Sequence, residues 1–298
     1  MRNFFRGCAM AAALTSLTPA SAQDRADAQP SEIVVTGARD RDEQIADFVA
    51  ALTPGRVGGQ LSRFEEPVCP AAIGLSPNHN KKVAARMRRV AGAAGVPVGQ
   101  EGCSPNVFVV VAQDRDAMIR AIRKQWRDPL GDRVRIPDQP GPAVALHLEG
   151  LLDANGIQAG VKQDDGDGRS GYYVVESSHG GSRLTPASRP HFIVSALVVE
   201  PDVIAGLTTM QLADYAVMRL LARTDPSRLE GSTAPTILTI LEAPIGSLVP
   251  ASLTDWDLGF LRAFYGSAEN RYANQQRTEM QRLLRNDLDK AQQQSGRE

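Results

Sequence analysis

The sequence predicts an α+β fold: a mixed β-sheet with packed amphipathic helices, one disulfide and a C-terminal helix. Two apolar runs, NVFVVVA (106–112) and HFIVSALVV (191–199), have the continuous hydrophobicity of strands that are buried on both faces. Several other segments carry apolar residues at helical spacing, as the polar segment 269–293 does with its single apolar stripe. Two cysteines, Cys69 and Cys103, remain after an N-terminal export signal.

That signal occupies residues 1–22, which have the pattern of a secretory signal peptide. Arg2 and Arg6 form its basic start, residues 9–17 its apolar run, and the tripeptide ASA at 20–22 its cleavage site. No later stretch approaches the roughly 20 apolar residues that a membrane helix needs. We therefore expect a periplasmic or secreted protein without a transmembrane segment after the signal is removed.

Charge and cysteine content narrow the classes of function. The chain has 33 basic and 34 acidic residues and a net charge of −1, which does not favour a nucleic-acid partner. In an exported protein the isolated pair Cys69 and Cys103 is most simply a disulfide, which would stabilise the fold by roughly 3–4 kcal/mol. Two thiols are too few for a structural zinc site, and no C-x-x-C motif is present.

The chain after the signal divides into four predicted parts. Residues 23–40 form a polar, flexible leader, 41–128 an α/β module, 129–142 a connector rich in Pro and Asp, and 143–298 an α+β module with a C-terminal helix. The α/β module opens with a helix over 41–53, because four apolar residues recur there at helical spacing: Ile45, Phe48, Val49 and Leu52.

The rest of the α/β module alternates helix and strand. Residues 80–94 carry an apolar helical stripe that stops at Gly95 and Pro97, with a basic, solvated face formed by Lys82, Arg86 and Arg89. The buried strand 106–112 follows Cys103. Asp114 then caps a helix, whose apolar side carries Ile119, Ile122 and Trp126.

The second module combines strands with capped helices. Strand-like AVALHL (143–148) precedes a hairpin, in which segments 156–163 and 171–177 flank a Gly/Asp-rich tip. The buried strand 191–199 follows, and segment 236–241 is a strand or a short buried segment. Two helices share the capping-box pattern, at Thr208 with Gln211 and at Thr254 with Asp257.

Few residues suggest chemistry. The four histidines (79, 147, 179 and 191) are scattered, and His147 and His191 fit structural roles in strands. Asp165, Asp167 and Glu176 fit three positions of a calcium loop, but Arg169 and Ser170 occupy a ligand and a turn position, which favours a hairpin tip. Asp214 lies in an apolar helix, where a buried acid requires an arginine or backbone N–H partner, or else has a shifted pKa. No phosphate-binding motif occurs, and we expect no metal or cofactor.

The segment EIVVTGAR, residues 32–39, resembles the Ton box of TonB-dependent outer-membrane receptors, especially those of sphingomonad-like alphaproteobacteria. In that family the segment pairs with TonB as an added strand, which a short, extended, β-branched segment can do physically. The chain is too short for the receptors' plug and barrel, and an edge strand of the protein's own sheet is the alternative. The resemblance implies that the partner-binding residues are Glu32, Ile33, Val34, Val35, Thr36 and Gly37.

A second resemblance covers residues 193–265, with GLTTMQLADY and LTDWDLGFLRAFY as its most recognisable stretches. This region resembles a group of uncharacterised exported bacterial proteins that are distantly similar to zinc-dependent peptidases of the zincin class. Zincins carry H-E-x-x-H on the corresponding helix, whereas this chain has Gln211, Leu212 and Tyr215 at those positions. The resemblance therefore implies a related fold without zinc and without activation of a water.

Together these observations predict an exported, non-enzymatic envelope accessory or binding protein. Its partner would be TonB or another periplasmic or outer-membrane protein, contacted through the Ton-box-like segment. The alternative is a secreted, peptidase-like hydrolase, for which Asp214 and His179 are the candidate catalytic residues. A structural scaffold in the cell envelope is a third class that the residues do not separate from the first.

Overall fold

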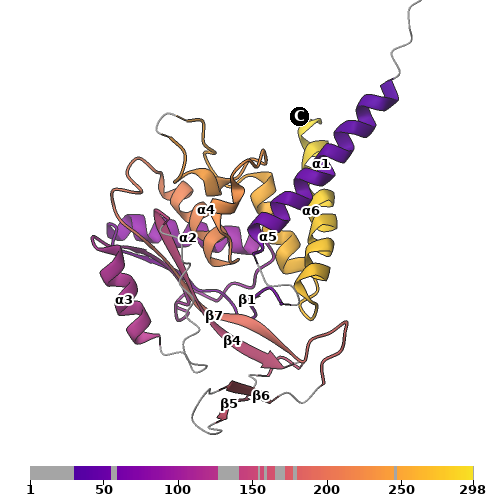
Figure 1. The fold of residues 1–298 in the computed structure, drawn as a ribbon. Helices are drawn as coiled ribbons and strands as arrows, with labels where there is room; N and C mark the ends of the chain where they lie inside the picture. The colour runs from indigo at the N-terminus through magenta and orange to yellow at the C-terminus, as the bar shows by residue number, and fades with distance from the viewer. Residues whose placement is uncertain are drawn as a thin grey trace, which may run out of the picture. The chain divides into compact units, whose positions relative to one another are not determined.

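The computed structural model shows the predicted α+β fold, with helices packed on a mixed sheet (Figure 1). It describes residues 30–54, 59–126, 141–153, 155–157, 160–164, 172–176, 180–244 and 247–297, and gives the backbone alone for 30–39, 160–164 and 172–176. The signal peptide, residues 129–140 of the connector, and the hairpin tip with Asp165 and Asp167 lie outside these residues, as does His179. Arg39–Glu298 forms one compact unit.

The helices and strands alternate in the first half of that unit, and helices dominate its second half. The helices are α1 (Pro30–Leu52), α2 (Pro77–Ala93), α3 (Arg115–Gln125), α4 (Thr209–Leu220), α5 (Asp255–Gly266) and α6 (Ala273–Ser295). The strands are β1 (Arg63–Phe64), β2 (Pro70–Ile73), β3 (Val107–Val111), β4 (Ala143–Asp153), β5 (Gly160–Asp164), β6 (Tyr172–Glu176) and β7 (Ser188–Val199). None of the described helices is long and apolar enough to span a membrane.

β7 is the central strand of the sheet. β4 pairs antiparallel along the whole of β7, from Asp153 opposite Ser188 to Ala143 opposite Val199. The other edge of β7 holds two parallel partners in succession: β1 at residues 191–192 and β3 at 195–199. β2 extends the sheet beyond β3 in parallel. Strands from both predicted modules thus belong to one sheet, while β5 and β6 form the predicted hairpin as a separate antiparallel pair.

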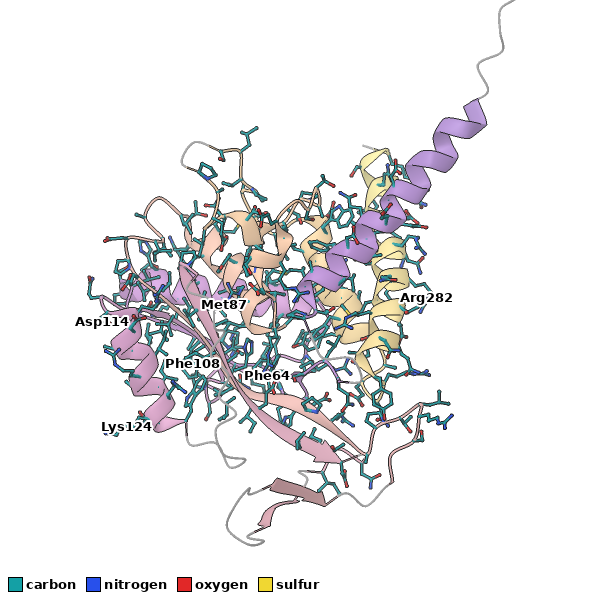
Figure 2. All side chains as sticks on the ribbon, viewed as in Figure 1. Phe64, Met87, Phe108, Asp114, Lys124 and Arg282 are labelled. Atoms are coloured by element: carbon teal, nitrogen blue, oxygen red, sulfur yellow. A yellow bond between two sulfur atoms is a disulfide. The ribbon has the colours of Figure 1, made fainter. Side chains whose placement is uncertain are left out.

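The two faces of the sheet bury different cores, as continuous apolar strands require. Val107 and Val109 of β3 belong to the main core, which α1, α2, α4, α5 and α6 cover. Val110 points to the opposite face and packs with Ile119 of α3 in a smaller cluster. Figure 2 shows Met87 on α2, within the main core, and Asp114 and Lys124 toward the two ends of α3.

The helix boundaries follow the predicted capping residues. Asp114 accepts a hydrogen bond from the backbone N–H of Ala117 at the start of α3. Both predicted capping boxes are present, with Thr208 and Gln211 at α4 and Thr254 and Asp257 at α5. The apolar stripe of α6 is confirmed as well, because Met280, Leu284 and Leu288 are buried.

The first helix corrects one prediction. Residues 45, 48, 49 and 52 are buried as expected, but α1 begins at Pro30 and includes the segment 32–37, which was predicted to be extended. That segment is not a strand of either described sheet. Helix growth is cooperative once a nucleus is fixed, so the anchored half of α1 favours continuation toward Pro30, a residue suited to the first helical turn.

Segment 236–241 is the second of its two predicted alternatives, a short buried segment. It contains a 3₁₀ helix, Ile237–Thr239, in place of a strand, and Ile237 and Leu238 are buried as the alternative required. The carboxylate of Asp257, itself fully buried, accepts hydrogen bonds from the backbone N–H of Ile237 and the hydroxyl of Thr236, at 2.9 and 2.6 Å. The same carboxylate caps α5, so one acid fixes the start of two helical segments.

Candidate functional site

Asp214 is completely buried in α4 and forms an ion pair with Arg86 of α2. Nε and one terminal nitrogen of Arg86 donate to the two carboxylate oxygens at 2.7 and 2.9 Å, and the backbone N–H of Leu253 donates at 2.8 Å. These are the arginine and backbone partners that a buried acid requires. The hydrogen bond with Asp214 raises the pKa of Arg86.

This pairing changes the interpretation of two residues. Arg86 was expected on a solvated basic face, but its side chain turns toward α4, where its planar fork of donors bonds both oxygens of the buried carboxylate. Asp214, a candidate acid or base of the hydrolase alternative, has both oxygens engaged inside the packing between α2 and α4. Its geometry is that of a structural tie between the two helices.

A serine and a histidine that sequence reasoning did not connect lie opposite each other in the sheet. Ser195 of β7 pairs with His147 of β4, so the two side chains lie on the same face, below α4. Both residues are buried, with exposed fractions of 0% and 4%. Ser195 Oγ and His147 Nε2, and also Nε of Arg219 on α4, have no hydrogen-bond partner within the described part of the chain.

The electrostatics of this pair oppose catalysis. Burial, together with the nearby charges of Arg223 and Arg219, lowers the pKa of His147 to about 3. Such an imidazole stays neutral at ordinary pH but is a weak base, and it lies in the core, with its ring 4.5 Å from that of Phe192. The space between the two side chains has room for a buried water at most. A substrate has no access to them, because both residues are buried.

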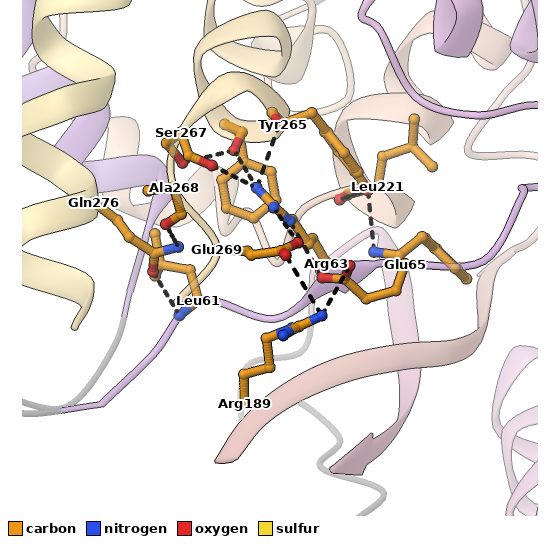
Figure 3. A network of polar contacts seen from close by, with 12 residues as sticks. Leu61, Arg63, Glu65, Arg189, Leu221, Tyr265, Ser267, Ala268, Glu269 and Gln276 are labelled. Atoms are coloured by element: carbon orange, nitrogen blue, oxygen red, sulfur yellow. Dashed lines mark hydrogen bonds and ion pairs between the residues drawn. The ribbon is translucent and has the colours of Figure 1, made fainter. Parts of the chain in front are cut away.

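A polar cluster of several side chains centres on Arg63 of β1 (Figure 3). One terminal nitrogen donates to three carbonyl oxygens at the end of α5, including those of Phe264 and Ser267 at 3.2 and 2.9 Å. The other donates to Glu269 at 2.9 Å, and Nε donates to Glu65 at 3.4 Å. Arg63 therefore caps α5 and ties it to the first strand.

Two carboxyl groups meet within that cluster. A terminal nitrogen of Arg189, on β7, lies 3.6 Å from an oxygen of Glu65 and 3.6 Å from one of Glu269. Burial raises the pKa of Glu65, with its hydrogen bond to Glu269 contributing in the same direction. Burial also acts to raise the pKa of Glu269, but hydrogen bonds with Arg63 and Glu65 outweigh it and the pKa is lowered. Of the two carboxyl groups, Glu65 therefore binds a proton more readily than Glu269.

The residues at the zincin positions serve the fold. The side chain of Gln211 closes the capping box of α4 and also donates to the carbonyl of Pro250 at 3.0 Å. The hydroxyl of Tyr215 accepts a hydrogen bond from Arg219 at 2.7 Å, inside the core. The described residues include no group of three His, Cys, Asp or Glu side chains that could hold a metal ion. His179, the other candidate of the hydrolase alternative, lies outside the described residues.

The predicted disulfide is present. Cys69, at the start of β2, and Cys103, in the loop before β3, are bonded with their Cα atoms 6.0 Å apart. The bond therefore ties the entrance of the β2–α2 unit to the entrance of β3, as the positions of the two residues predict.

Comparison of the chain with protein-family models, curated proteins and solved structures gives no match.

Proposed function

We propose that the protein is an exported, non-enzymatic binding protein of the cell envelope, which engages its partner through residues 32–37. The observation that carries this proposal is a conflict between sequence and backbone at the start of α1. Four consecutive residues that favour strands, followed by a glycine, occupy a helix: Ile33, Val34, Val35, Thr36 and Gly37. Local conflicts of this kind are expected at functional sites.

Because of this conflict, unfolding the helical state of the segment costs little free energy. β-Branched residues and glycine each disfavour a helix interior relative to alanine, and together these five residues cost roughly 3 kcal/mol. Opening the segment frees N–H and C=O groups, and pairing with the edge of a partner's sheet satisfies them again. The partner's edge thus replaces the hydrogen bonds of the helix.

The disulfide supports the location. Disulfides persist in oxidising compartments such as the periplasm, and Cys69 and Cys103 are bonded here. The resemblance of residues 32–39 to a Ton box makes the C-terminal domain of TonB the first partner to test. Another periplasmic or outer-membrane protein with an unpaired sheet edge would bind the segment through the same main-chain hydrogen bonds.

The test measures binding of the chain, from residue 23 onward, to the C-terminal domain of TonB by titration calorimetry. We expect wild type and the Val34→Thr variant, which keeps a β-branched residue, to bind with similar affinity. Val34→Pro should abolish binding, because proline removes a ladder donor.

A further pair of substitutions separates strand addition from docking of an intact helix. Val34→Ala combined with Val35→Ala stabilises the helix and lowers strand propensity. Strand addition predicts weaker binding of this double variant, whereas docking of a helix predicts equal or tighter binding. Equal binding of wild type and Val34→Pro, or no binding by wild type, would refute the assignment of this partner and segment.

A further inference from the structure

A guanidinium group lies against both sulfur atoms of the disulfide. A terminal nitrogen of Arg88, on α2, is 3.0 Å from Cys103 Sγ and 3.9 Å from Cys69 Sγ. A cation near a cysteine favours its thiolate, the form in which a sulfur leaves when a disulfide is broken.

The rest of the loop fixes the position of Arg88. The other terminal nitrogen donates to the carbonyl of Gly99, and the first also donates to that of Gln100 at 3.1 Å. Gly99 permits this approach, because a Cβ atom there would lie 2.9 Å from Cys103 Sγ. Absence of a side chain at Gly99 thus lets the chain fold closely around the sulfur and the guanidinium.

The two cysteine residues differ in exposure. Cys69 is buried at 5% exposure, whereas Cys103 is partly exposed and lies in a loop whose neighbours Glu101, Gly102 and Ser104 are exposed. Of the two residues, Cys103 is therefore the more accessible from solution, and we take it as the point of attack for an external thiolate. Partial exposure beside a positive charge is the environment of reactive cysteines and of disulfides that are readily reduced.

From this geometry we propose that Cys69–Cys103 is a thiol–disulfide exchange site that reacts with dithiol reductants. The thiolate of the dithiol bonds to Cys103 Sγ, the S–S bond breaks, and its electron pair leaves on Cys69 Sγ. The second thiol of the reagent then loses its proton and attacks the reagent sulfur of the mixed disulfide, so that Cys103 leaves as a thiolate. The protein gains two electrons and two protons, and the dithiol is oxidised to its own disulfide.

Arg88 has the same role in both steps. The sulfur that departs first, Cys69, lies 3.9 Å from its guanidinium, and the one that departs second, Cys103, lies 3.0 Å away. The positive charge therefore stabilises each thiolate as it forms and shifts the equilibrium toward the dithiol form of the protein. The exposed acid of the same loop, Glu101, acts in the opposite direction, but solvent screens its charge.

The experiment equilibrates the full chain with reduced and oxidised dithiothreitol and measures the fraction of protein disulfide by thiol alkylation and mass spectrometry. We expect Arg88→Met to lower the equilibrium constant for reduction about tenfold, which corresponds to about 30 mV. Arg88→Lys keeps the charge and should stay within about threefold of wild type. The matched control is Arg89→Met, which changes the next, exposed arginine and should leave the constant unchanged.

A second measurement needs no variant. The pH dependence of the alkylation rate of Cys103 in reduced wild type should give a thiol pKa clearly below the ordinary value of about 8.5. An ordinary or raised pKa overturns the proposal, and so does equal reduction of wild type and Arg88→Met. If Arg88→Lys falls as far as Arg88→Met, anchoring of the loop carbonyls explains the effect, and the exchange role is refuted.

Discussion

Removing Arg86 and removing Asp214 from their ion pair should cost different amounts of folding stability, because the two side chains are unequally buried. The side chain of Asp214 is 0% exposed and that of Arg86 is 24% exposed. Arg86→Met leaves a carboxylate sealed in the core with one backbone N–H donor, and should lower the free energy of unfolding by about 3–5 kcal/mol. Asp214→Asn leaves an arginine that can turn to water, and should cost less, about 1–3 kcal/mol.

The double variant makes the decisive comparison. Arg86→Met combined with Asp214→Asn removes both charges, so the sealed, unpaired charge of the worse single variant disappears. We expect the double variant to be more stable than Arg86→Met alone, with a coupling energy of about 2–3 kcal/mol between the two sites.

Urea unfolding at pH 7, followed by circular dichroism with the disulfide intact, measures all four proteins, provided that their m values agree. Additive costs, or a loss from Asp214→Asn that exceeds the loss from Arg86→Met, would contradict this reasoning. Arg89→Met serves as the control, because it removes a neighbouring but exposed charge of α2.

Three further predictions concern His147, Gly74 and Asp257. The pKa of His147 lies near 3 in the folded protein, against 6.5 ordinarily, so its contribution to stability is complete above pH 6.5. That contribution falls by about 1.4 kcal/mol per pH unit below 6.5, and urea titrations of His147→Gln should show a shallower acid loss than wild type. Gly74→Ala should lower the free energy of unfolding by about 3 kcal/mol or more, because its Cβ would lie 1.9 Å from a carbonyl oxygen of β3. Gly95→Ala has a similar positive φ but open space around the Cβ, and should lower it by about 1–2 kcal/mol in the same assay. Asp257→Ala should lower the melting temperature far more than Asp255→Ala, which removes an exposed acid of the same helical turn. Equal losses would contradict the role of Asp257 in fixing the start of two helical segments.

Much of the fold could be predicted because the signals are local. Asp114, Thr208 and Thr254 start helices where their side chains satisfy free N–H groups, and this chemistry depends on only four consecutive residues. The valine run of β3 is predictable for a similar reason, since a strand covered on both faces has no polar side.

Other features depend on contacts between distant residues. The apolar surroundings of Asp214 predict a partner, but the sequence does not identify Arg86, which lies 128 residues away. Ser195 lies opposite His147 because of the register in which β4 pairs with β7. Only the folded sheet defines that register. The helical state of residues 33–36 does not follow from their own strand preference, because helix growth from the anchored half of α1 overrides that preference.

The position of β7 in the chain governs when folding can be completed. Its residues, 188–199, join β1, β3 and β4, all of which are synthesised earlier, so none of these three strands has its β7 partner until nearly two hundred residues have been made. Such long-range pairing slows folding and delays the closure of the sheet. The sheet of a nascent chain therefore stays incomplete for most of its synthesis, and its apolar strands lack their final partners during that time.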